Sequence, residues 1–141
     1  IFTDTVKNND RVVDGVTLHR IVAEKDFGTV KKGVSGGWVE SEHNLSQTGN
    51  SWIANEAIVM GNSRVQDNAA VKDYAVLTHN VSVSGNARVL GNTTVTGNVE
   101  IKDRAMVLEN ARVNNDTNIK TKIISRESDS EMFRFYASAP F

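Results

Sequence analysis

The sequence of 141 residues predicts an all-β fold, a single-stranded parallel β-helix of about four triangular coils. Three observations support this prediction. Residues 49–120 repeat every six residues without insertion or deletion, and the third position of each hexad is small or β-branched. A fixed period of this kind sets the architecture before any local propensity does. The fifth position is always apolar, as Ile53, Val59, Val65, Val71, Leu77, Val83, Val89, Val95, Ile101, Val107, Val113 and Ile119.

A period of six suits a short strand followed by a corner, whereas an α-helix needs apolar residues at spacings of three and four. The third and fifth positions are two residues apart, so they face the same side of a strand, and the fourth and sixth positions face outward. The first and second positions are rich in Gly, Asp and Asn, which tolerate the positive φ of a tight bend. Three such strands close one coil, and successive coils stack by parallel pairing about 4.8 Å apart.

The second position of the hexad supports the same register. Asn50, Asn68 and Asn86 are eighteen residues apart, so they share one corner of the predicted prism. Asn80 and Asn98 share another. Aligned side-chain amides can hydrogen-bond along such a stack, and we therefore expect Asn ladders at the corners.

The outward positions divide into three faces of different character. The second face is apolar at Ile58, Met60 and Val76, and the third is polar. Apolar patches mark either an interface between chains or a surface covered by the same chain. We expect the first face to form an interface between chains, or to lie under residues 1–48, through Trp52, Leu90, Met106 and Leu108.

Residues 1–48 break the repeat and are predicted to form an N-terminal cap region, since a β-helix must cover its exposed strand edges. We expect this region to fold onto the first coil or along the face of Trp52; the alternative is a separate recognition module. Residues 13–16 predict a turn, residues 16–23 a strand, and the glycine-rich residues 33–37 another turn.

Residues 121–141 form a different C-terminal segment, with a strand predicted at Ile123 and Ile124 followed by an aromatic tail. Aromatic side chains are enriched at interface cores. We therefore expect Phe133, Phe135 and Tyr136 to form an end cap or a contact with a partner.

Composition narrows the classes of function. The net charge of −1 offers no electrostatic attraction to nucleic acid or to an anionic membrane. There are no cysteines, and the three histidines have no metal-ligand spacing, so we expect no metal site. The apolar runs are too short to span a membrane, and the start does not resemble a signal peptide. We expect a cytoplasmic or virion protein.

Over residues 49–120 the twelve hexads resemble those of the hexapeptide-repeat superfamily of left-handed β-helices. The chain departs from the pattern of the family's enzymes, because the glycine after the aliphatic residue comes one position later, as in Leu90-Gly91-Asn92. The stretches Leu18-His19-Arg20-Ile21 and Gly36-Gly37-Trp38-Val39-Glu40 are similar to uncharacterised hexapeptide-repeat proteins of enterobacteria and their phages. The resemblance implies a left-handed coil. It also implies kinship to acyltransferases that are commonly trimers, take acyl-coenzyme A and use a histidine base near a subunit interface.

His79 is the best catalytic candidate, because it replaces glycine at a corner shared with Gly61 and Gly97. It has no evident carboxylate to orient it, although Asp73 and Asp116 lie in neighbouring hexads. The alternative is that His79 is simply a tolerated corner residue.

The hexads are not interrupted by the long loop that often builds the substrate site of the acyltransferases. The sequence therefore favours a non-catalytic structural or protein-binding module without a cofactor, with a protein partner or self-association as a homotrimer. The alternative is a small acyltransferase that uses coenzyme A.

Overall fold

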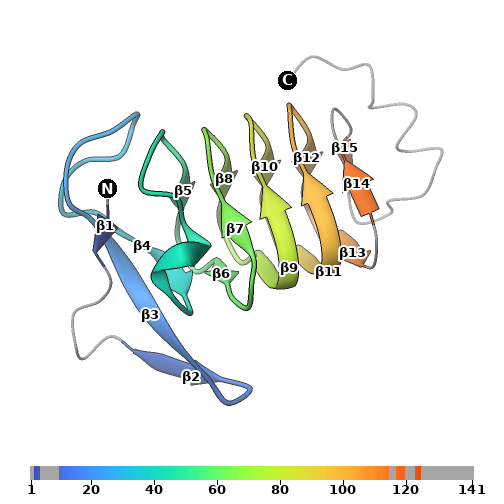
Figure 1. Ribbon diagram of the computed structural model, residues 1–141, viewed down its shortest axis with the longest axis horizontal. Coiled ribbons are helices and arrows are strands. Elements are labelled where there is room, and N and C mark those ends of the chain that lie inside the picture. The colour runs from blue at the N-terminus through green and yellow to red at the C-terminus, as the bar shows by residue number, and fades with distance from the viewer. Residues whose placement is uncertain (1, 4–9, 115–116, 120–122, 125–141) are drawn as a thin grey trace.

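The computed structural model describes residues 2–3, 10–114, 117–119 and 123–124. The described chain is nearly all β, which confirms the predicted fold class (Figure 1). One 3-10 turn, Glu42–Asn44, interrupts the strands. The strands are β1 (Phe2–Thr3), β2 (Arg11–Val13), β3 (Val16–Ala23), β4 (Ser35–Val39), β5 (Trp52–Ile53), β6 (Ile58–Val59), β7 (Arg64–Val65), β8 (Ala70–Val71), β9 (Val76–Val83), β10 (Arg88–Val89), β11 (Thr94–Ile101), β12 (Met106–Val107), β13 (Arg112–Asn114), β14 (Thr117–Ile119) and β15 (Ile123–Ile124).

The repeat folds into a β-solenoid of about four turns with the predicted register. On the first face Ala70 pairs with Trp52 in one direction and with Arg88 in the other, and Arg88 pairs in turn with Met106. Each step is eighteen residues and each pairing is parallel. Figure 1 shows the turns side by side along the long axis of the molecule. Strand β15 continues this ladder on β12, as predicted for Ile123 and Ile124.

The inward positions form the core. The fifth-position residues from Ile53 to Val107 are completely buried, and Val113 is 6% exposed. The third-position residues from Ser51 to Ala111 are buried as well. Two of the polar ones use their hydroxyl groups inside: Ser63 Oγ accepts a hydrogen bond from the Val81 N–H (3.1 Å), and Thr93 Oγ1 donates to the Leu90 carbonyl (2.6 Å).

The corners share one backbone conformation. Every first position from 49 to 109 has a φ between 58° and 99°. These residues are Gly49, Asn55, Gly61, Asp67, Asp73, His79, Gly85, Gly91, Gly97, Asp103 and Glu109. Non-glycine residues rarely adopt positive φ, and Asn and Asp do so more readily than most. The hexad therefore specifies a positive φ at its first position as well as buried side chains at its third and fifth positions.

Side chains at the first position also satisfy the backbone of the next coil. Asp67 Oδ2 accepts a hydrogen bond from the Gly85 N–H (3.0 Å), and Asp73 Oδ2 accepts one from the Gly91 N–H (2.9 Å). Asn55 Oδ1 accepts the N–H of Asp73 in the same way (3.2 Å). A corner amide would otherwise lack a strand partner, so a carboxylate or amide in one turn stabilises the bend in the following turn.

The predicted Asn ladder is present at one corner, where Asn80 Nδ2 donates to Asn98 Oδ1 (3.0 Å). At the corner of Asn50, Asn68 and Asn86 the described residues show no bond between side-chain amides, so the prediction of a ladder there is wrong. The Arg88 guanidinium binds the backbone oxygens of Asn68 (2.9 Å) and Asn86 (3.1 Å) at that corner.

The N-terminal region contains a hairpin, and strand β1 pairs in antiparallel fashion with the second strand of this hairpin, β3. Strands β2 and β3 pair in antiparallel fashion around Asp14 (φ 51°) and Gly15 (φ 81°), which confirms the turn predicted for residues 13–16. Strand β3 has the bounds predicted for it, Val16–Ala23. It then pairs with β4 in antiparallel fashion, and β4 pairs in parallel with β6 of the first turn. Parallel stacking therefore starts before the first hexad.

The prediction of a turn at residues 33–37 is only partly right. Gly33 bends the chain at φ 92°, but Gly36 and Gly37 lie within strand β4. A Cβ atom at Gly36 would lie 2.5 Å from the Ile53 carbonyl oxygen, and one at Gly37 would lie 2.5 Å from the Ala57 carbonyl oxygen. These glycines allow β4 to pack closely against the solenoid, which local sequence reasoning could not reveal.

Asn44 joins the N-terminal region to the third face. It is completely buried, and its Oδ1 accepts the N–H groups of Glu40 (3.0 Å) and Ser41 (2.9 Å). Its Nδ2 donates to the carbonyl oxygens of Gly61 (3.2 Å) and Ser63 (2.7 Å). One amide thus satisfies backbone groups on both sides of this contact.

The hairpin is held on the first turn by a charged cluster around Glu56. Trp38 Nε1 donates to Glu56 Oε1 and Arg20 Nη2 to Glu56 Oε2, each at 3.2 Å. The guanidinium carbons of Arg20 and Arg11 lie 4.9 and 5.1 Å from the Trp38 ring centroid, within cation–π range. The Trp38 hydrogen bond, aided by the charges of Arg20 and Arg11, lowers the pKa of the Glu56 carboxyl.

This lowered pKa predicts a pH-dependent contribution to stability. Because the folded state favours the carboxylate, the contribution is fully present above the ordinary glutamate pKa of about 4.3 and is lost as the pH falls through the lower folded pKa. Glu56→Gln should therefore destabilise the protein at pH 7, by less than about 1 kcal/mol because the carboxylate is partly exposed. The difference between variant and wild type should shrink toward pH 3 in thermal unfolding. An equal difference at both pH values would contradict this account.

The stacked corners predict a contrast between two glycines that both have positive φ. A Cβ at Gly85 would lie 2.8 Å from the Asp103 nitrogen, whereas one at Gly15 would meet nothing within 4 Å. Gly15→Ala should cost about 1 kcal/mol through its backbone conformation alone. Gly85→Ala should cost about 1–3 kcal/mol more, because the neighbouring turn must move. Urea unfolding followed by circular dichroism measures both; equal losses would show that the corners are not tightly stacked.

Candidate functional site

The first face carries the main surface feature of the described chain. Trp52 is only 7% exposed, because Phe27 packs edge-on against it with ring centroids 5.4 Å apart. The segment around Phe27 therefore covers the start of this face. Whether Trp52 also belongs to an interface between chains stays a prediction.

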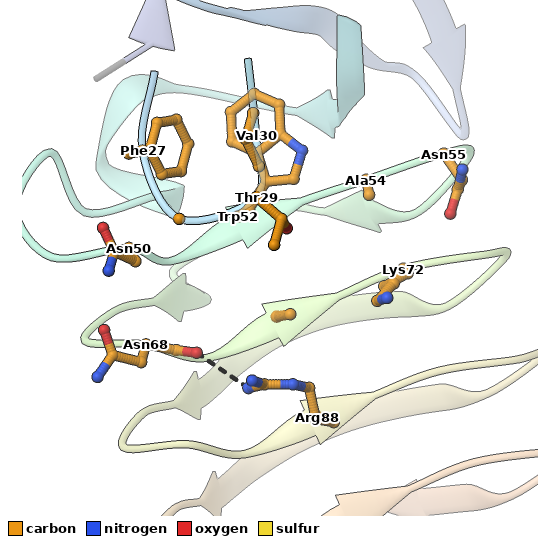
Figure 2. Close-up of a pocket in the computed structure, with 12 residues that line it drawn as sticks. Phe27, Thr29, Val30, Asn50, Trp52, Ala54, Asn55, Asn68, Lys72 and Arg88 are labelled. Carbon is orange, nitrogen blue, oxygen red and sulfur yellow. Dashed lines mark hydrogen bonds between the residues drawn. The ribbon is translucent and has the colours of Figure 1, made fainter. Parts of the chain in front are cut away.

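Below this cover the face is hollowed. Ala54 and Ala70 occupy outward positions where their neighbours carry long side chains, and both are half-buried. The resulting pocket has a volume of about 530 Å³ and is shown in Figure 2. Its residues come from the covering loop and from three turns of the solenoid. They are Phe27, Gly28, Thr29, Val30, Asn50, Trp52, Ala54, Asn55, Asn68, Ala70, Lys72 and Arg88.

Among the described residues that line this pocket, the charged ones are Lys72 and Arg88, and none carries a carboxylate. Arg88 is half-buried, and its Nη1 donates to three backbone oxygens, those of Asn68 (2.9 Å), Ala87 (3.0 Å) and Asn86 (3.1 Å). Its position is thus set by the corner of the solenoid. Figure 2 shows the bond to Asn68 along one side of the pocket.

Lys72 and Arg88 were not predicted as site residues from the sequence. The available signal was their position: Lys72 and Arg88 occupy outward places on a face that is otherwise partly apolar. The covering loop could not be foreseen, because the contact between Phe27 and Trp52 joins a non-repeat segment to the repeat.

Further along the same face lie Leu90, Met106 and Leu108, which are half-buried and which we call the apolar ridge. Leu90 follows Arg88 by two residues on the same turn, and Met106 pairs with Arg88 on the next. The ridge therefore adjoins the pocket. Its predicted role as an interface stays a prediction.

His79 lies at the predicted corner, between Gly61 and Gly97, with φ 73°. Its side chain is exposed, and its Nδ1 lies 3.0 Å from Thr78 Oγ1 and 2.8 Å from Thr96 Oγ1. Asp73 does not orient it, since that carboxylate accepts the Gly91 N–H. Asp116 lies outside the described residues. The described surroundings of His79 are therefore hydroxyl groups.

The other histidines belong to the N-terminal region. His19 Nδ1 lies 3.0 Å from Asp10 Oδ1, and His43 Nε2 lies 3.1 Å from the Gly61 carbonyl oxygen. The described residues contain no group of three or more His, Cys, Asp or Glu that could hold a metal ion. The predicted tail residues Phe133, Phe135 and Tyr136 lie outside the described part of the chain.

Comparison with known proteins gives a partial match to a protein described as an acetyltransferase. The chain is 36% identical over 69 residues to the uncharacterized acetyltransferase YdcK of Escherichia coli strain K12. The match covers 48% of this chain but only 21% of YdcK, so the chain spans about a fifth of that relative. No family model matches. The likeness and the solenoid together fit the hexapeptide-repeat superfamily.

In the described part of the chain, no helix has the length and apolar character needed to cross a membrane.

Proposed function

We propose that this chain is a non-catalytic β-solenoid that serves as a structural or protein-binding module. The observation that carries the proposal is the apolar ridge of Leu90, Met106 and Leu108, whose side chains are only partly buried by the described residues. Burial of such side chains between chains is worth about 25 cal/mol per Å². A rigid solenoid that carries such an apolar ridge is suited to holding partners in fixed positions.

The occupant we propose for the ridge is a second copy of the chain. The net charge of −1 gives copies little reason to repel each other. The resemblance to the hexapeptide-repeat superfamily, whose members are commonly trimers, favours a homotrimer. The similarity of residues 18–46 to proteins of enterobacteria and their phages favours a bacteriophage origin. A cytoplasmic or virion location follows from that origin, with no nucleic acid or membrane as partner.

The proposal predicts that wild-type protein has the mass of three chains in light scattering. Leu108→Glu should give single chains, because it puts a charge into the interface, while circular dichroism stays unchanged. The matched control is Ser84→Glu, which adds the same charge at the same hexad position on the polar third face and should remain trimeric. A wild-type mass of one chain would overturn self-association. A mass of two chains would overturn the trimer.

The second candidate function is a small acyltransferase that uses acyl-coenzyme A, and the observation that favours it is the match to YdcK. His79 would act as the base, and its Nδ1 contacts would leave the other ring nitrogen for a substrate. General base catalysis contributes about 10²–10⁴-fold to a rate.

Acetyl-coenzyme A distinguishes the two functions. A ligand that binds only the folded state raises stability by about 2.7 kcal/mol at a hundred times its dissociation constant. The first proposal predicts no thermal shift with millimolar acetyl-coenzyme A, and it predicts that His79→Ala leaves the fold intact. A thermal shift, together with acetyl transfer that His79→Ala abolishes at unchanged circular dichroism, would establish the acyltransferase.

A further inference from the structure

We propose that the pocket under the Phe27 loop binds a small hydroxylated organic anion, about the size of a sugar acid. The charged group would lie beside Lys72 and Arg88, and the body would rest on Ala54 and Ala70. The observations that carry this inference lie within one chain and do not include the proposed self-association. The volume of about 530 Å³ falls within the range typical of small-molecule sites.

The guanidinium of Arg88 is preorganised for binding an anion. Three backbone oxygens hold its Nη1, whereas its Nε and Nη2 have no hydrogen-bond partner within the described residues. A guanidinium that is already fixed loses little conformational entropy on binding. Its remaining N–H groups can donate to an oxyanion, and hydrogen bonds between charged groups are among the strongest in proteins.

The charges of the pocket also favour an anion as the ligand. Lys72 is exposed and has no ion pair within the described residues, and none of the lining residues is acidic. Elsewhere Lys102 pairs with Glu100 (3.5 Å), and Arg20 pairs with Glu56 (3.2 Å). Two cations that share a concave site without a carboxylate attract an anion more strongly than isolated surface charges do.

The remaining lining residues specify the body of the ligand. The side chains of Asn50, Asn68 and Thr29 offer hydrogen-bond donors and acceptors. Asn55 adds the donors of its Nδ2, since its Oδ1 accepts the Asp73 N–H. These groups suit hydroxyls, while Ala54 forms an apolar floor beside them. A purely apolar anion would leave the amides unpaired, which is costly when they lose water. A hydroxylated anion satisfies both parts of the site.

The test is titration of the full chain with glucuronate, glucose 6-phosphate and glucose, followed by calorimetry and by the fluorescence of Trp52 in the pocket wall. We expect at least one of the two anions to bind and glucose to bind at least about tenfold more weakly. Binding of the carboxylate alone or of the phosphate alone would identify the oxyanion. No binding of either anion up to about 10 mM, or equal binding of glucose, would overturn the proposal.

Three variants locate the binding. Lys72→Gln should weaken the binding of the anion by about tenfold. Ala70→Leu keeps both charges but fills the hollow, and should abolish binding. Lys102→Gln removes the same charge from the third face and should change nothing. Unchanged affinity in Lys72→Gln or in Ala70→Leu would overturn the site, and so would an equal loss in Lys102→Gln. Circular dichroism of each variant confirms that the solenoid is intact.

Discussion

The positive φ at the first position of each hexad is the constraint on which the structure depends. It turns the chain after each short strand, so that the third and fifth positions always face inward and residues eighteen apart always pair. Each bend also leaves a backbone N–H without a strand partner, and at several corners a side chain of the preceding turn binds it, as Asp67 does for Gly85. Conformation and burial therefore agree at every sixth residue, and at several of these residues a side-chain hydrogen bond to the next turn reinforces them.

Because the corners determine the inward positions, the outward positions are free to vary, and the surface features arise there. Ala54 and Ala70 make a hollow only because Trp52, Lys72 and Arg88 beside them are large. The same outward positions one turn later carry Met106 and Leu108 and make an apolar ridge instead. A regular backbone can thus present charge and apolar surface side by side without any change in its hydrogen bonding.

Much of the fold followed from the period alone, including the strands, the register and the buried residues. The contacts of the N-terminal region did not, because each depends on a partner distant in the sequence. A side chain at position 36 would clash with the Ile53 carbonyl oxygen, so a glycine is needed there. Asn44 is needed because its amide donates to a backbone carbonyl of the third face. His79 lies at the corner predicted for it, while its predicted catalytic role stays a prediction, and the two cations of the pocket were not predicted. From the sequence alone Arg88 is expected to be an ordinary solvent-exposed charge. Its place in a pocket depends on the loop around Phe27, which is distant in the sequence.

The irregular start of the chain explains why the pocket lies where it does. Its apolar residues cover Trp52 on the first face, and Leu18 and Trp38 pack on Ile58 of the second. The N-terminal region covers only the first turns of the solenoid. The surface of the first face is therefore lower just beyond the loop that contains Phe27. The pocket lies there, with the loop as one wall and the two cations beyond it. A repeat protein made only of identical turns would lack such a difference in height. The sequence outside the hexads therefore creates the enclosed surface, and the hexads hold it rigid.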